Sequence, residues 1–300
     1  MSTAQGTGDP QKGAARGAER GAAGGTEAEP GPRALAGVEP LEVNALARPG
    51  MTTDLPTPTR ALAVGAHPDD IEFGCGGTLA KWAAGGCEIV HLVLTDGAKG
   101  SWDPGRDEAS LVAQRQDEQR EAARVLGGGD TVGFLSWPDG ELRNGVREQW
   151  QVCRWIRTVR PDVVLGHDPW RRYRLHPDHR NAGFLLTDAL VAAREPHYFP
   201  DQELEPHRPA ALLLWEADLP NHVEDVSGFA DTKIAALLAH KSQHQSTMGI
   251  SPGRPDQGLG RGVVDPQVEL FGAQVLAQLG EHGGLAGMAL GESFHLINRL

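Results

Sequence analysis

Residues 61–70 read Ala-Leu-Ala-Val-Gly-Ala-His-Pro-Asp-Asp, an apolar run that stops at one histidine and two carboxylates. A run this short, apolar nearly throughout, suits a strand that is covered on both faces of a sheet. Similar runs follow at 88–96, 131–137, 162–167 and 211–215. Patterns typical of helices separate or follow them, at 72–85, 107–127, 145–160, 178–195 and 230–243. This alternation predicts an α/β fold, with a Rossmann-like, mostly parallel sheet and helices on both faces.

The first 54 residues differ from the rest of the chain in composition. They are rich in Gly, Ala, Glu and Pro and show no sustained apolar periodicity. Such a segment cannot bury enough apolar surface to offset the entropy lost on ordering. We therefore expect a disordered tail over 1–54 and a single catalytic domain over 55–300. A stretch dense in Gly and Pro, 249–262, is a candidate lid or rim over the site.

Charge and hydropathy limit the possible partners. The formal net charge is -12, whereas binding a phosphate backbone needs clustered Lys and Arg, so we expect no nucleic-acid partner. No apolar run approaches the ~20 residues of a membrane helix, and the N-terminus lacks the apolar segment of a signal peptide. Cys75, Cys87 and Cys153 are too few and too irregularly spaced for a disulfide framework or a zinc knuckle. We expect a cytoplasmic protein without a membrane partner, and the oligomeric state stays open.

Two clusters of His and Asp come just after two predicted strands. The motif at 67–70 is His-Pro-Asp-Asp, and the motif at 176–179 is His-Pro-Asp-His. Ligands of open α/β sheets bind beyond the carboxyl ends of the strands, so the two clusters should converge there. Either motif alone also suits an ordinary turn, because Pro fixes φ and Asp caps a helix. Together they predict a metal site, since imidazole and carboxylate hold a catalytic zinc and leave a position for water.

Other chemistries lack their sequence signals. A dinucleotide site needs Gly-x-Gly-x-x-Gly directly after the first strand, but the glycine-rich stretch 74–77 comes too late. The carboxylates at that turn would also repel a pyrophosphate. A serine-triad hydrolase is not supported, because the chain has no Gly-x-Ser-x-Gly elbow.

The stretch AHPDDIEFGCGGTLA, residues 66–80, together with HPDHR, residues 176–180, resembles the GlcNAc-phosphatidylinositol deacetylase family, also called the PIG-L or LmbE-like family. Its bacterial members deacetylate sugars in the mycothiol, bacillithiol and aminoglycoside or glycopeptide pathways. Further similarity to the family lies at 115–118, 138–142 and 240–243, with a weaker similarity at 292–295. The resemblance implies a metal-dependent hydrolase that removes the acetyl group from an N-acetylated amino sugar or its conjugate. The alternatives are an amidase acting on a thiol-sugar conjugate and a catalytically silent sugar-binding relative.

The resemblance also implies roles for individual residues. One Zn²⁺ per chain, or Fe²⁺ in its place, would be held by His67, Asp70 and His179. The catalytic groups would be Asp69 as general base, His176 as the group that meets the developing oxyanion, and Asp178 as the residue that orients His176. A nearby carboxylate raises the pKa of a histidine, which would favour a cationic His176.

Three further residues are candidates for contacts with the small-molecule acetamido sugar: Arg115, Asp139 and Tyr173. Sugar hydroxyls need fixed donors and acceptors, which Arg115 and Asp139 would supply. Competing interpretations are a surface pair of Arg115 with Glu118 and a plain Asp-Gly turn at Asp139. Tyr173 lies in a basic and aromatic loop, but it departs from the Tyr-Gly-His-Pro-Asp-His of several mycothiol-pathway relatives. It stands one place further from the histidine, with Leu175 at the glycine position.

Overall fold

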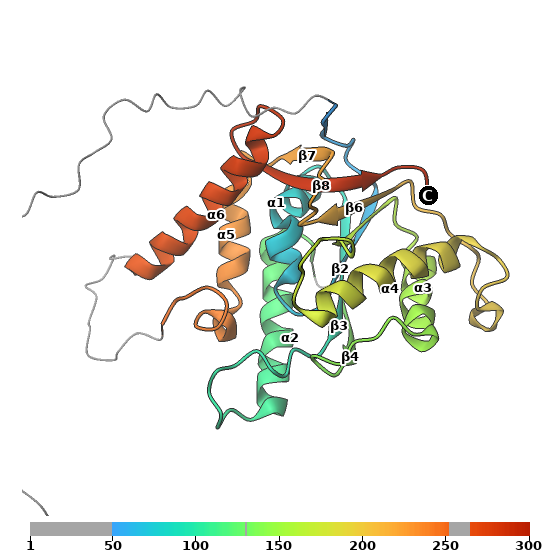
Figure 1. Cartoon of the computed structure of the whole chain (residues 1–300), viewed down its shortest axis with the longest axis horizontal. Helices are drawn as coiled ribbons and strands as arrows, with labels where there is room; N and C mark the ends of the chain where they lie inside the picture. The colour runs from blue at the N-terminus through green and yellow to red at the C-terminus, as the bar shows by residue number, and fades with distance from the viewer. Residues whose placement is uncertain (1–49, 130, 252–264) are drawn as a thin grey trace, which may run out of the picture. The chain divides into compact units, whose positions relative to one another are not determined.

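Figure 1 shows the computed structural model of the chain, which describes residues 50–129, 131–251 and 265–300. In chain order the helices and strands are β1 (Thr52–Thr53), β2 (Arg60–Gly65), α1 (Asp70–Ala84), β3 (Glu88–Thr95), α2 (Glu108–Val125), β4 (Val132–Trp137), α3 (Val146–Val159), β5 (Val163–His167), α4 (Pro177–Arg194), β6 (Ala211–Trp215), β7 (His222–Asp225), α5 (Ala230–Leu238), α6 (Pro266–Gly284) and β8 (Gly291–Ile297). Short 3₁₀ helices lie at Pro200–Gln202 and Lys241–Gln243. No helix of the described ranges is long and apolar enough to cross a membrane.

The described strands form one sheet of eight, in the order β1-β7-β8-β6-β5-β2-β3-β4. All neighbouring pairs are parallel except those of β8, which runs antiparallel to both β6 and β7. The five strands predicted from the sequence are all present and lie next to one another. The prediction of a mostly parallel sheet is therefore confirmed.

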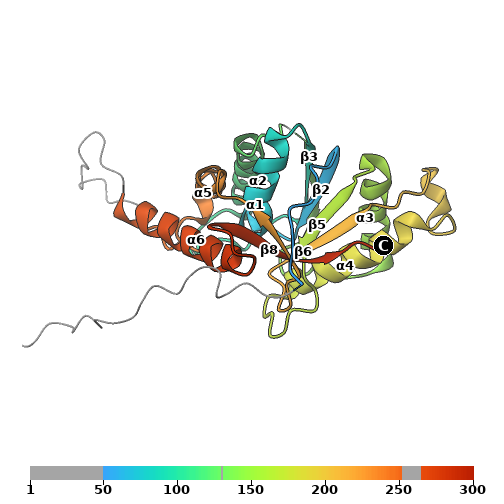
Figure 2. The ribbon, with the colours of Figure 1, turned by 90° about the horizontal axis from the view of Figure 1, so that it is seen from above.

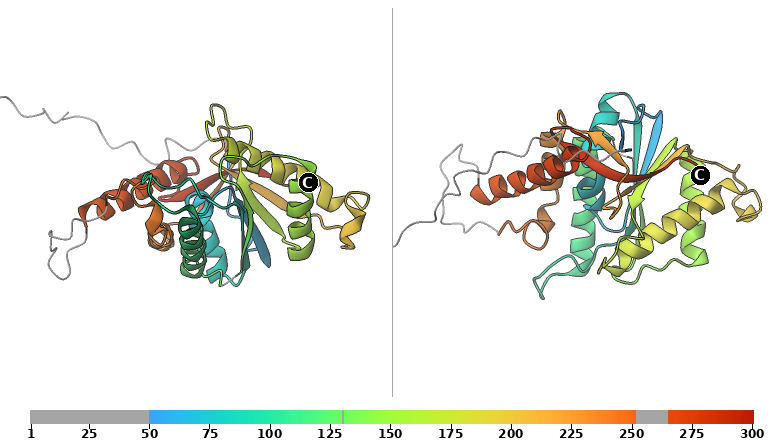
Figure 3. Two further views of the ribbon diagram at one scale, coloured as in Figure 1. Left: turned by 90° about the horizontal axis from the view of Figure 1, so that it is seen from below. Right: turned by 45° about the horizontal axis from the view of Figure 1, so that its top comes forward.

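Helices cover both faces of this sheet, as Figure 2 shows edge-on. Alternate residues of a strand point to opposite faces. In β2, Leu62 and Val64 pack in a core with residues of α3 and α4. Ala61 and Ala63 pack in a second core with residues of α1 and α2. The helix α6 packs against β8 and α5, on the side of the sheet away from α3 and α4 (Figure 3).

Three elements of the C-terminal third were not predicted: β7, α6 and β8. The strand β8 is inserted between β6 and β7, and such an insertion depends on pairing between distant segments rather than on local pattern. The predicted helix over 230–243 ends earlier, at Leu238, and His240 leaves the helical conformation at φ -80 and ψ 63. Most of the candidate lid at 249–262 lies outside the described residues.

Residues 52–54, which the sequence assigns to the tail, contact the domain. Thr52 and Thr53 form β1, which pairs in parallel with β7. The carboxylate of Asp54 lies 2.8 Å from Nζ of Lys81 and accepts a hydrogen bond from the backbone N–H of Asp225 at 2.9 Å. A polar strand of two residues has no periodicity to read, so its pairing is invisible in the sequence. The rest of the predicted tail, 1–49, lies outside the described residues.

A chain that starts at residue 56 should be less stable than one that starts at residue 50. It loses the β1 ladder, the Asp54–Lys81 pair and the 2.8 Å bond from the backbone N–H of Leu55 to the buried carboxylate of Glu224. Leaving buried polar groups short of partners costs about 1–3 kcal/mol, and we expect a loss of this size in the free energy of unfolding. Urea unfolding of the two truncations measures it. Equal midpoints and slopes would contradict a stabilising role for residues 50–55.

Candidate active site

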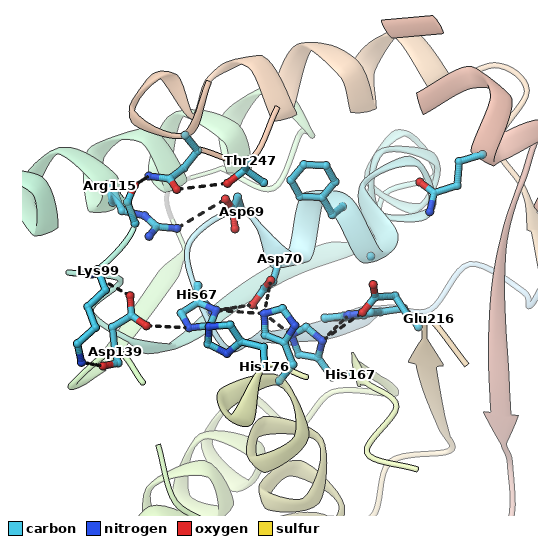
Figure 4. A pocket seen from close by; sticks show the side chains of 17 residues that line it. His67, Asp69, Asp70, Lys99, Arg115, Asp139, His167, His176, Glu216 and Thr247 are labelled. Atoms are coloured by element: carbon cyan, nitrogen blue, oxygen red, sulfur yellow. Dashed lines mark hydrogen bonds and ion pairs between the residues drawn. The ribbon is translucent and has the colours of Figure 1, made fainter. Parts of the chain in front are cut away.

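The two His-Asp clusters converge at the carboxyl ends of β2 and β5. These strands are neighbours in the sheet, with Val64 opposite Gly166. After β2 the chain turns into α1 at Asp70, and after β5 it loops to α4, which begins at Pro177. The side chains of both clusters line one cavity of about 420 Å³, shown in Figure 4. The strand-end position expected from the sequence is therefore where the clusters lie.

Donor atoms of His67, Asp70 and His179 lie close together, and these three residues form the donor triangle. Nδ1 of His67 lies 3.2 Å from Nε2 of His179 and 3.4 Å from Oδ2 of Asp70. Nε2 of His179 lies 3.3 Å from Oδ1 of Asp70. Ligand atoms about 2.0–2.2 Å from a tetrahedral metal are separated from one another by about 3.3–3.6 Å. The three predicted ligands therefore lie close enough together to hold one ion, with His67 nearest one oxygen of Asp70 and His179 nearest the other.

Two buried carboxylates contact Nε2 of His67. Its Nε2 lies 3.1 Å from Oδ2 of Asp178 and 3.2 Å from Oδ1 of Asp139. Burial by itself lowers the pKa of His67, but hydrogen bonds to Asp139, Asp178 and Asp70 hold that pKa well above its usual value. The carboxylates bind the Nε2 side of the ring, and Nδ1 faces His179 and Asp70; a carboxylate on the far nitrogen is common in metal-bound histidines.

The contacts of Asp178 and Asp139 add to what the sequence indicates for them. The carboxylate of Asp178 is fully buried and accepts from His67 and from the backbone N–H groups of Gly140 and Leu142, at 2.6 and 3.2 Å. Only its backbone N–H reaches His176, donating to Nδ1 at 3.3 Å. The Asp178 side chain therefore orients His67 rather than His176, because it points back under the first turn of α4. Asp139 lines the cavity as expected, but its carboxylate also holds His67 and the backbone N–H of Lys99.

Asp69 faces the cavity without joining the donor triangle (Figure 4). Burial raises the pKa of Asp69 to about 6, against the opposing charge of Arg115. Arg115 lies 3.6 Å from the Asp69 carboxylate and donates to the carbonyls of Pro68 and Gly97 at 2.6 and 2.8 Å. It is 3% exposed and lines the cavity, so the surface pair with Glu118 does not form. Its Nε is buried and has no hydrogen-bond partner in the described part of the chain.

His176 lies at the cavity with its ring stacked on that of His179, 4.7 Å between centroids. Burial, together with the neighbouring His67 and His179, lowers the pKa of His176, so the expected cationic ring is not favoured. Because Nδ1 accepts from the backbone, the proton of the neutral ring is on Nε2, which can donate a hydrogen bond. Tyr173 is 91% exposed and does not line the cavity, so the structure gives no support to its predicted contact with substrate.

Sequence reasoning missed His167, the last residue of β5. Its Nε2 lies 3.2 Å from Oδ2 of Asp70, while Nδ1 accepts from Nε1 of Trp215 at 3.0 Å and from Arg174 at 3.1 Å. Two donors on Nδ1 place the proton on Nε2, where it holds the Asp70 carboxylate. The available signal was its position: it ends a predicted strand next to the strand that carries His67. Glu216 lies close to His167. Burial raises the pKa of Glu216, but the hydrogen bond with His167 and the charge of Arg174 lower it to about 2.

Comparison with known proteins supplies the family. The model of the PIG-L family, described as GlcNAc-PI de-N-acetylase, matches residues 62–190. The diacetylchitobiose deacetylase of Thermococcus kodakarensis is 34% identical over 187 residues, which cover 61% of this chain and 70% of the relative. The chain belongs to the PIG-L family. It is therefore a deacetylase, a hydrolase that acts on an amide bond.

Other PIG-L relatives agree with this assignment. The 1D-myo-inositol 2-acetamido-2-deoxy-alpha-D-glucopyranoside deacetylase of Kineococcus radiotolerans is 28% identical over 294 residues, with 76% of this chain and 79% of the relative covered. The solved structure of N,N'-diacetylchitobiose deacetylase from Pyrococcus horikoshii superposes with a TM-score of 0.69 at 26% identity, covering 80% of this chain and 84% of that one. The family predicted from the paired His-Pro-Asp motifs is thus confirmed.

Proposed function

We propose that this PIG-L member is a Zn²⁺-dependent deacetylase that hydrolyses an acetamido sugar, or a conjugate of one, to acetate and the free amine. The observation that carries the proposal is the donor triangle of His67, Asp70 and His179, with Asp69 and His176 left over beside it. Binding a metal or a sugar does not require an extra base and an extra donor at that place, whereas amide hydrolysis requires both. The names of the relatives support an acetylated amino sugar as the substrate class.

A divalent metal at the three donor atoms would supply Lewis-acid chemistry, polarising the acetyl carbonyl and acidifying water. Asp69 accepts the proton of the attacking water. With a pKa of about 6, its carboxylate is mostly ionised at neutral pH, yet basic enough to hold a proton and pass it to the departing amine nitrogen. The oxygen of water thus bonds to the acetyl carbon, and the C–N bond breaks. The proton that Asp69 took from this water ends on the amine nitrogen.

His176 and Arg115 complete the site. His176 lines the cavity, and the Nε2–H of its neutral ring would donate to the carbonyl oxygen as negative charge develops there. Arg115 fixes the turn that carries Asp69 through the Pro68 carbonyl, and its charge favours the ionised form of Asp69. Both residues line the cavity.

The test is turnover of a panel of N-acetylated sugars: N-acetylglucosamine, N,N'-diacetylchitobiose and an N-acetylglucosamine–inositol conjugate. Released amine and acetate are measured with the zinc-loaded protein, with the protein stripped by chelator, and after zinc is restored. We expect release in equal amounts, lost with the metal and recovered at about one zinc per chain. If the zinc-loaded protein hydrolyses no acetamido sugar, the alternative of a catalytically silent sugar-binding protein is favoured. If activity is recovered with Fe²⁺ but not with Zn²⁺, the metal is iron.

The pH dependence of kcat/KM should report Asp69. The carboxylate must be ionised to accept a proton, so activity is present above its pKa of about 6 and is lost as the pH falls through that value. We expect kcat/KM to decrease about tenfold per pH unit on the acid side. Zinc content is measured over the same range, because protonation of His67 would release the metal. A profile that stays flat well below pH 6 with zinc retained would remove Asp69 from the role of base.

A further inference from the structure

Asp69 has a backbone conformation that L residues rarely adopt. Its φ is 104 and its ψ is -27, and the residue is not glycine. Holding a side-chain-bearing residue in this region costs about 1–3 kcal/mol and requires surroundings that fix it. Whatever fixes Asp69 also decides where its carboxylate points.

A buried glutamine from another helix holds the Asp69 backbone. The N–H of Asp69 donates to Oε1 of Gln119, in α2, at 3.0 Å. Gln119 is fully buried, and its Nε2 donates to Oε1 of Glu72 at 2.7 Å. The other carboxylate oxygen of Glu72 lies 3.2 Å from Nε2 of His240, just past the end of α5. A continuous chain of hydrogen bonds therefore runs from the Asp69 backbone to His240.

Glu72 determines which way the Gln119 amide faces. Glu72 is fully buried, and its contacts within the described residues are with Gln119, His240 and His91, the last at 3.5 Å. The NH₂ end of Gln119 faces this carboxylate and donates to its Oε1. The carbonyl end is thereby directed at the N–H of Asp69. A flipped amide would set two acceptors face to face and two donors face to face, at a buried site where unpaired groups are costly.

We infer that Gln119, oriented by Glu72, is a positioning residue that keeps Asp69 in its left-handed conformation with its carboxylate toward the cavity. Without this bond the turn can relax to negative φ, which swings the Asp69 side chain away from the attacking water. A misplacement of about 1 Å can cost about 100-fold in rate. The inference rests on the proposed function, since it assumes that Asp69 acts as the base.

The first test replaces Gln119 by methionine, which is similar in size but has no amide. For Gln119→Met we expect kcat to fall about 10–100-fold while KM changes less than about twofold, with zinc content unchanged. The matched control is Gln202→Met. Gln202 is also buried but bonds to Arg157 and to the carbonyl of Trp150, on the α3–α4 side of the sheet. It should lose stability without losing kcat, and equal kcat in wild type and Gln119→Met would overturn the inference.

A double-mutant cycle with Asp69→Asn separates positioning from general damage. If Gln119 acts through Asp69, adding Gln119→Met to Asp69→Asn should lower kcat by less than about twofold further. A full additional 10–100-fold loss would show that Gln119 acts by another route. Full activity of Asp69→Asn alone would instead contradict the proposed function. Should Gln119→Met fail to fold, Gln119→Asn takes its place: it withdraws the amide from Asp69 by about one bond length, roughly 1.5 Å, and should show the same split of kcat and KM.

Discussion

Replacing Asp69 by asparagine should lower kcat by roughly 10²–10⁴-fold and leave about one zinc bound per chain. Asparagine has the same shape as aspartate but cannot take a proton from water. The donor triangle of His67, Asp70 and His179 does not include Asp69, so the metal should stay. The measurements are kcat on a sugar that the wild type hydrolyses and metal content by elemental analysis.

His179→Ala is the comparison for this variant. It removes one of the three donor atoms, so zinc and activity should be lost together. Loss of zinc from Asp69→Asn as well would place Asp69 among the ligands. Wild-type kcat with zinc retained would exclude it as the base.

The sheet and the donor triangle could be predicted because both depend on local signals. A doubly covered parallel strand is a short apolar run, and its carboxyl end is marked by the polar residues that follow it. Such polar residues, the two His-Asp motifs, follow β2 and lie in the loop after β5. The pairing of β2 with β5 brings them together. Asp69 and His176 could be singled out as candidates because each motif has one more ionisable group than a metal needs.

The direction of individual side chains could not be predicted. Asp178 was expected to serve its neighbour His176, but helical geometry turns its carboxylate under the first turn toward His67. His167 was read as the end of an apolar run, because nothing nearby in sequence shows that Trp215 and Arg174 fix its tautomer. Gln119 in α2 and Glu72 in α1 are 47 residues apart in the chain and meet only in the folded structure.

The helix α1 shows how a distant strand supports the site. Cys75 leaves the helical conformation, at φ -151 and ψ 19, and divides α1 into two parts. Gly74, just before it, lies so close to Trp215 that a Cβ would stand 2.4 Å from the indole ring. The close packing expected for this glycine-rich stretch is therefore present. The break frees the backbone N–H groups of Gly77 and Thr78, which donate to the carboxylate of Glu292 in β8 at 2.9 and 2.7 Å.

Glu292 thus caps the second part of α1 from inside the protein. It is 1% exposed, and Nζ of Lys233, itself 2% exposed, lies 2.6 Å from its Oε1. Lys233 also donates to the carbonyl of Phe73, a residue that lines the active-site cavity. One buried ion pair therefore joins β8, α5 and the part of α1 that carries Asp70.

Glu292→Ala should lower the free energy of unfolding by about 3–5 kcal/mol, because it leaves the Lys233 ammonium buried without its counter-charge and two helix N–H groups without acceptors. Lys233→Met combined with Glu292→Gln removes both charges, retains an acceptor for the N–H groups, and should cost clearly less than Glu292→Ala alone. Urea unfolding of the three proteins measures both effects. If the double variant is as unstable as Glu292→Ala, the loss of stability comes from packing at β8 rather than from the unpaired charge of Lys233. If Glu292→Ala unfolds like the wild type, the second part of α1 does not depend on β8, and the weak sequence similarity at 292–295 needs another explanation.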